Sequence, residues 1–113
     1  MTLTDVLIEI EKEQRPYFEN YLEYAKIIKK EVERFAGKAK VFIFGSILRK
    51  DEIPQDIDIL IISPRLKSTS QKSKMLAKIL KRIGPASPFE IHLITPEEYN
   101  GWYKYFIKEK VEI

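Results

Sequence analysis

The chain has 113 residues, of which 44% are hydrophobic and 33% charged, and it carries a formal net charge of +3. This length fits one domain around one core, and the composition is that of a folded protein rather than a disordered one. The sequence contains no cysteine, which excludes disulfides and thiolate metal sites.

The sequence gives no sign of a membrane or secretory segment. No apolar run approaches the roughly 18 residues of a membrane span, and the N-terminal stretch MTLTDVLIEIEKEQ is too acidic for a signal peptide. We therefore expect a cytoplasmic protein. The charge is unevenly distributed, because residues 59–89 contain seven basic residues and no acidic one. Such a segment could attract phosphates, but a solvated helix face is the favoured interpretation.

Residues 1–36 are predicted to be helical. Mainly apolar residues recur at spacings of three and four and form one continuous stripe. The stripe consists of Leu7, Ile10, Gln14, Phe18, Tyr21, Ala25, Ile28, Val32 and Phe35. Pro16 lacks a backbone donor, so we expect a kink or break near Arg15. Gly37 is the expected end of the helix.

Two apolar stretches follow and predict two strands. KVFIF leads to Gly45, after which a short helical turn and the loop DEIPQ are expected. DIDILII, residues 56–62, is the second predicted strand. Its end is apolar on both faces, which is typical of a central strand covered on two sides.

The second half of the chain predicts a helix, a strand and a last helix. After the loop SPRLKSTSQ, one face of a helix carries Met75, Leu76, Ile79, Leu80 and Ile83, and GPASP then interrupts it. FEIHLI, residues 89–94, is the third predicted strand. Thr95, Pro96 and Glu98 form a strong helix start with a capping box. The expected buried face of this last helix consists of Tyr99, Trp102, Tyr103, Phe106 and Ile107. The element order predicts a small α/β domain with three or four strands.

Two carboxylates, Asp56 and Asp58, stand at the start of the most apolar strand. Alternate residues of a strand point to the same face, so the pair should lie side by side while Ile57 and Ile59 face the other way. Two charges about 7 Å apart repel by about 2 kcal/mol at an effective dielectric constant near 20. A divalent cation such as Mg²⁺ would remove this repulsion. The alternative is that both aspartates lie in solvent and accept hydrogen bonds from turn amides.

Glu90 and His92 share one face of the third predicted strand. If this strand lies beside the second, Glu90 can reach the aspartates, and three carboxylates from two adjacent strands would form a two-metal site. Otherwise Glu90 is a solvent-facing strand residue. His92 is the only histidine of the chain, and we interpret it as a packed or surface imidazole without a chemical role.

Gly45 and Ser46 lie where the first strand gives way to a short helical turn. Glycine permits a sharp turn and a close approach of phosphate to the backbone, and the following amides and the serine hydroxyl are donors. Arg49 could add positive charge toward a triphosphate. A Gly-Ser pair at such a position is also common for purely structural reasons, so its weight depends on its neighbours.

The combination of these features resembles a known family. An apolar strand, Gly-Ser, nine residues, Asp-x-Asp in an apolar strand and an acid on a later strand are similar to the layout of the DNA polymerase beta-like nucleotidyltransferase superfamily. FGSILRKDEIPQDIDILII resembles in particular the minimal nucleotidyltransferases of archaea and bacteria. The resemblance covers roughly residues 20–107. It implies a mixed sheet flanked by helices, with residues 1–113 as one domain, 1–36 as an N-terminal helical segment and 40–107 as the catalytic core.

The resemblance also implies roles for residues. Gly45 and Ser46 would hold the nucleotide, with Arg49 as the arginine common after that pair. The metal ligands and catalytic acids would be Asp56, Asp58 and Glu90, around two Mg²⁺ ions. Many relatives have glycine where this chain has Lys50 and serine where it has Gln55, and the third acid is often aspartate. Because neither Lys50 nor Gln55 replaces a metal ligand, these departures put nucleotide affinity in question before the chemistry.

The implied reaction is attack by a hydroxyl on the α-phosphate of a nucleoside triphosphate such as ATP, with release of pyrophosphate. In 113 residues there is no room for a domain that binds the acceptor, so a partner protein or a second copy would bring it. Minimal members commonly pair with a helical HEPN-type protein as a toxin–antitoxin couple and transfer AMP to its tyrosine, or neutralise it by binding. Trp102 and Tyr103 could supply the interface, although core packing is the favoured interpretation.

Two other functions compete with an enzyme. The chain could be an antitoxin or regulatory subunit that kept the fold without turnover, but a pure binder has no physical reason to retain repelling carboxylates. It could also bind nucleic acid through residues 65–82, but that segment lacks the aromatic residues that stack bases.

Overall fold

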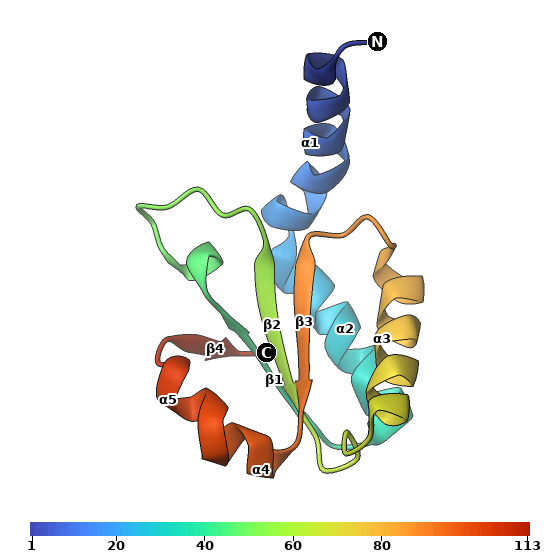
Figure 1. The fold of residues 1–113 in the computed structure, drawn as a ribbon, viewed down its shortest axis with the longest axis vertical. Helices are drawn as coiled ribbons and strands as arrows, with labels where there is room; N and C mark the ends of the chain where they lie inside the picture. Colours follow the sequence, from blue (N-terminus) through green and yellow to red (C-terminus); the bar gives the residue numbers. More distant parts are fainter.

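The computed structural model describes residues 1–113 and contains one mixed four-stranded sheet (Figure 1). Its strands are β1 (Lys40–Phe44), β2 (Ile57–Ile62), β3 (Phe89–Ile94) and β4 (Lys110–Glu112), and their order in the sheet is β3-β2-β1-β4. The pair β2 and β3 is parallel, whereas β1 runs antiparallel to both β2 and β4. The predicted fold class, a small mixed sheet flanked by helices, is confirmed.

Helices cover both faces of this sheet (Figure 1). The helical elements are α1 (Leu3–Glu19), α2 (Tyr21–Ala36), the 3₁₀ turn η1 (Ser46–Leu48), α3 (Thr69–Ile83), α4 (Pro96–Glu98), the π-helical turn η2 (Tyr99–Tyr103) and α5 (Lys104–Phe106). One face packs against α2 and α3, and the other packs against the segment from α4 to α5. No helix is both long enough and apolar enough to cross a membrane.

The main core lies between the sheet and the two long helices α2 and α3. Alternate residues of the central strand, Ile57, Ile59 and Ile61, are fully buried there, together with one stripe from each helix. The stripes consist of Ala25, Ile28, Val32 and Ala36 on α2 and Met75, Ile79 and Ile83 on α3. The hydrophobic effect therefore fixes which face of β2 is buried, and a slip of one residue would expose it.

The N-terminal helix differs from its prediction. The chain remains helical through Pro16 and breaks at Asn20, whose backbone and side-chain nitrogens both donate to the Pro16 carbonyl. Of the kink or break expected near Arg15, the break is therefore wrong, because the hydrogen-bonded cap at Asn20, five residues later, ends the helix instead. The predicted stripe is also not uniformly buried: α1 contains no buried residue and extends away from the body of the molecule (Figure 1). Tyr17 anchors its end by donating a hydrogen bond to the Ile83 carbonyl.

The C-terminal segment also differs from its prediction. Tyr99, Tyr103 and Ile107 pack against the second face of the sheet, but the Trp102 and Phe106 side chains are 56% and 66% exposed. The predicted buried face is therefore wrong for these two residues. The reason is the π-helical turn, which is wider than an α-helical turn. Tyr99 and Tyr103, four residues apart, lie on its buried side, whereas Trp102 is turned outward.

Five of the seven basic residues between positions 59 and 89 lie on α3. Lys74, Lys81 and Arg82 are exposed, Lys72 pairs with Glu98 at 3.1 Å, and the Lys78 ammonium lies 5.2 Å from the centre of the Phe35 ring. These lysines interact with solvent and with neighbouring side chains of the chain itself, as on a solvated helix face.

Candidate metal centre

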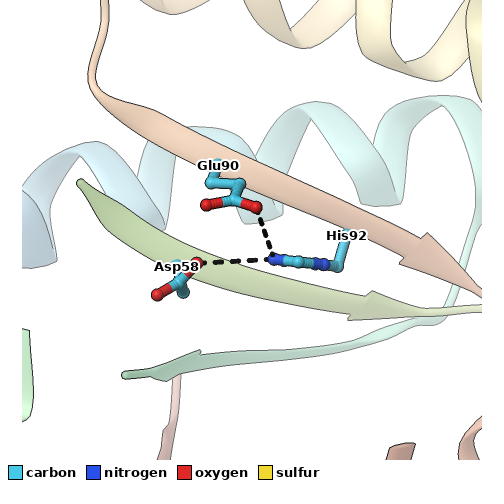
Figure 2. A group of neighbouring side chains, drawn as sticks. All are labelled: Asp58, Glu90 and His92. Atoms are coloured by element: carbon cyan, nitrogen blue, oxygen red, sulfur yellow. Dashed lines mark hydrogen bonds and ion pairs between the residues drawn. The ribbon is translucent and has the colours of Figure 1, made fainter. Parts of the chain in front are cut away.

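Asp58 and Glu90 lie side by side on the face of the sheet opposite the main core. They are direct partners in the register of the parallel strands β2 and β3, so their side chains leave the sheet in the same direction (Figure 2). The Asp58 side chain is 17% exposed and the Glu90 side chain 55% exposed. The adjacency of β2 and β3, on which the role of Glu90 depends, is therefore present in the fold.

His92 joins this pair, although we expected it to have no chemical role. Its Nε2 atom lies 3.4 Å from Asp58 Oδ1 and 3.7 Å from Glu90 Oε1 (Figure 2). Each of the three residues offers one ligand atom, and these atoms lie within 4.8 Å of one another. The signal that could have revealed His92 is its position two residues after Glu90 on the same strand face.

Asp56 directly precedes β2, which begins at Ile57 rather than at the predicted residue 56. The side chain is half-buried. Burial, and then the negative charge of Glu90, raise the pKa of the Asp56 carboxyl above its usual value. The structure thus brings Asp56 within electrostatic reach of Glu90, but it leaves Asp56 outside the close group of Asp58, Glu90 and His92.

Gly45 lies directly against the Asp58 carboxylate. Its φ of 85° is in the region that favours glycine, and a Cβ atom at this position would collide with Asp58 Oδ2. The reason for this proximity is the antiparallel pairing of β1 and β2, which places Phe44 opposite Asp58. A group bound at the Gly45 turn would therefore lie beside the acids.

Ser46 and Arg49 occupy the turn after Gly45. Ser46 begins η1 and is half-buried, whereas Arg49 is exposed and pairs with Glu52 at 3.2 Å. Arg49 and Gly45 line one cleft of about 290 Å³, whose other walls include Phe106 and Lys108. The structure thus places Arg49 close to the Gly-Ser turn, with its guanidinium paired to Glu52.

The donor atoms fit a divalent cation. No lysine or arginine forms an ion pair with Asp56, Asp58 or Glu90, and the basic group that lies beside these acids is the His92 imidazole. Carboxylate oxygens are the hard ligands that Mg²⁺ and Mn²⁺ prefer. The space that glycine leaves open at position 45 gives Asp58 room beside the turn. The chemistry of the donor set and this opening are both compatible with a bound metal.

Comparisons with known proteins agree with the geometry. The family model described as nucleotidyltransferase domain matches residues 25–112. The crystal structure of a provisionally assigned nucleotidyltransferase is similar with a TM-score of 0.66 and 30% identity, and the match covers 78% of this chain and 95% of that one. A second such structure, from Sulfolobus solfataricus, has a TM-score of 0.52 and 25% identity over 83% of this chain and 82% of that one. No curated protein matches.

Proposed function

The chain belongs to the nucleotidyltransferase domain family, and on this premise we propose that it transfers AMP from ATP to a hydroxyl group of a partner protein. The observation that carries the proposal is the pairing of Asp58 with Glu90 directly beside the Gly45 turn. Acids that hold a metal and a turn that admits phosphate must be adjacent for this chemistry, because a metal held by Asp58 and Glu90 would then neutralise charge on phosphates bound at the Gly45 turn.

The site residues form two groups, one that would bind the metal and one that would bind the nucleotide. Asp56, Asp58 and Glu90 would hold Mg²⁺, with two ions as the expected number. Gly45 and Ser46 would bind the triphosphate, and Arg49 would add positive charge once its pair with Glu52 opens. When bound, the metal supplies charge neutralisation at the phosphates and favours ionisation of the attacking hydroxyl.

The reaction is a substitution at the α-phosphorus. The acceptor oxygen forms a bond to this phosphorus, the bond to the oxygen that bridges the α- and β-phosphates breaks, and pyrophosphate leaves with that electron pair. Glu90 would take the proton of the acceptor hydroxyl, because its exposed carboxylate borders the solvent from which an acceptor arrives. The protein's contribution is mainly to hold the reacting atoms in line.

We propose that the acceptor is carried by a small helical protein of HEPN type, for which this chain would be the antitoxin. The support is an aromatic surface formed by Trp102, Tyr105 and Phe106, each of which is more than half exposed. Phe106 also lines the cleft that contains Gly45. Exposed aromatic residues are enriched at protein interfaces, and a partner docked on this surface would lie beside the bound nucleotide.

A labelling experiment tests the proposal. The protein is incubated with ATP labelled at the α-phosphate, Mg²⁺ and the product of its neighbouring gene, and label is expected on the neighbour. The double variant Asp56→Asn, Asp58→Asn should abolish labelling. Asp51→Asn is the matched control, because it removes an exposed carboxylate from the preceding loop and should leave labelling unchanged.

Two results would contradict this function. Labelling that survives the double variant would remove the metal site from the mechanism. A stable complex that forms without any labelling would instead identify a binding module that kept the fold but not the turnover. The docking surface has its own test: Trp102→Ala with Tyr105→Ala should weaken the complex while leaving Mg²⁺–ATP binding intact, because neither residue lines the cleft that contains Gly45.

A further inference from the structure

We propose that His92 is a nitrogen ligand of the metal held by Asp58 and Glu90, and that it makes this site prefer a first-row transition ion such as Mn²⁺ over Mg²⁺. The inference deepens the proposed function, on which it rests for the presence of a metal. It concerns one residue that the pattern of three carboxylates does not include.

The positions of the three side chains support this ligand set. His92 follows Glu90 by two residues, so both project from the same face of β3, and Asp58 projects beside them from β2 (Figure 2). Ligands bound to one ion at about 2.1 Å are about 3.0 Å apart when they are adjacent in an octahedron. His92 Nε2 lies 3.4 Å and 3.7 Å from the nearest oxygens of Asp58 and Glu90, and the three ligand atoms all lie within 4.8 Å of one another, so side-chain rotations without backbone movement could bring them around one ion.

Aromatic neighbours hold the imidazole in this orientation. The centre of its ring lies 5.2 Å from that of Phe44 and 6.3 Å from that of Tyr103, which meets it edge-on. The His92 side chain is only 25% exposed. Because packing already restricts the ring, little further side-chain entropy is lost when its Nε2 atom binds a metal.

The donor type determines the expected selectivity. Mg²⁺ prefers oxygen ligands and strict octahedral geometry, whereas first-row transition ions gain affinity from an imidazole nitrogen. Two carboxylates and one imidazole therefore form a mixed set that favours the transition ion. In the alternative arrangement, His92 would only donate a hydrogen bond to Asp58 and orient it, and the metal would then contact oxygen alone.

Pulsed EPR separates these arrangements directly. His92 is the only histidine of the chain, so histidine that carries ¹⁵N only in its ring labels this imidazole alone. Mn²⁺ is bound to the full-length protein together with a non-hydrolysable ATP analogue. Direct ligation predicts nitrogen modulation whose frequency changes between ¹⁴N- and ¹⁵N-histidine samples, while nitrogens of the backbone and the nucleotide give the same signal in both. Bound Mn²⁺ without this isotope effect would overturn the proposal.

Metal affinities provide an independent measurement. In His92→Gln an oxygen donor replaces the nitrogen, so the ratio of Mn²⁺ to Mg²⁺ affinity should fall by about tenfold, mainly through weaker Mn²⁺ binding. Asp51→Asn is the control and should keep the wild-type ratio. An unchanged ratio in His92→Gln would contradict the inference but leave the proposed function standing, provided that binding still requires Asp58. If neither ion binds to the wild-type protein with nucleotide, the metal-dependent function fails as well.

Discussion

The two faces of the strand pair β2 and β3 differ in composition: one is part of the main core, and the other carries the candidate metal ligands. One face consists of isoleucines and other apolar side chains that are packed under α2 and α3. The opposite face begins with Asp58, Glu90 and His92 and becomes apolar only toward the strand ends, where the segment from α4 to α5 covers it. Because side chains alternate with a period of two, neighbouring residues of one strand can contribute separately to stability and to the proposed chemistry.

This separation means that substitutions on the two faces should have different consequences. A change under α2 and α3 should lower the free energy of unfolding without a specific effect on metal binding. A change among the acids should abolish chemistry while the fold stays intact, since removal of one charge from a repelling group costs the fold little.

The largest expected effect is the loss of activity after a substitution on the face that carries Asp58 and Glu90. Asp58→Asn should lower the rate of nucleotidyl transfer by at least about 10³-fold, or about 4 kcal/mol of activation free energy, because it removes a proposed metal ligand. The midpoint of urea unfolding, measured without metal, should stay the same or rise. A large loss of stability in this variant would show that the two faces are not independent.

Ile59→Ala is the corresponding substitution on the buried face. It should lower the free energy of unfolding by about 3 kcal/mol, because Ile59 is fully buried and its loss leaves a cavity. Urea denaturation measures this change. Mn²⁺ affinity per folded molecule, measured in the absence of urea, should match that of the wild type, and a specific loss of affinity would argue against separate roles.

Gly45→Ala should affect both stability and binding, because Gly45 has a positive φ and also contacts Asp58. The substitution should cost about 2 kcal/mol of stability, since alanine at a φ of 85° is strained. Its Cβ would also displace the Asp58 carboxylate, so metal and nucleotide affinity should fall together. The midpoint of unfolding and a titration with Mg²⁺–ATP measure the two effects. A variant with lower stability but normal affinity would show that the contact with Asp58 is unimportant for binding.

The smallest expected effect is a pH-dependent change in the free energy of unfolding when Asp56 is substituted. Burial and the charge of Glu90 raise the pKa of Asp56, so the folded state binds this proton more tightly than the unfolded state. Ionised Asp56 therefore costs stability above its folded pKa, and the cost disappears below the ordinary aspartate pKa, where the carboxyl is protonated in both states.

Asp56→Asn should therefore stabilise the metal-free protein near pH 7 by on the order of a few tenths of a kcal/mol, after allowance for solvent screening. At a pH below the ordinary aspartate value the gain should vanish. Urea unfolding at both pH values with a metal chelator measures it. A variant that is destabilised equally at both would indicate that Asp56 makes a favourable contact in the folded chain.

The elements could be predicted because their signals are local. Alternation and apolar runs indicate β1, β2 and β3, and the capping box at Thr95 marks the start of α4. The closeness of Gly45 to the Asp-x-Asp strand followed from the family resemblance. The partnership of Asp58 with Glu90 depends on which strands are adjacent, and this is a property of the whole sheet.

Other features could not be predicted because they depend on tertiary structure. The roles of Trp102 and Phe106 depend on a π-helical turn that has no clear sequence signal, so helical periodicity placed them on the wrong face. The stripe on α1 is apolar in the sequence whether or not another element covers it, and its exposure follows from where the chain turns at Asn20. The position of His92 required the β2–β3 register.

The contact between Gly45 and Asp58 limits how the sequence of such a chain can evolve. The register of β1 and β2 aligns the glycine with the aspartate, so the length of the loop 50–55 within their connection is not needed to set that alignment. Insertions near Lys50 or Asp51 should therefore be tolerated, and descendants could acquire new substrate-selecting loops there. A shift of one residue in the pairing would instead turn Asp58 toward the isoleucines, and no loop could restore the lost geometry.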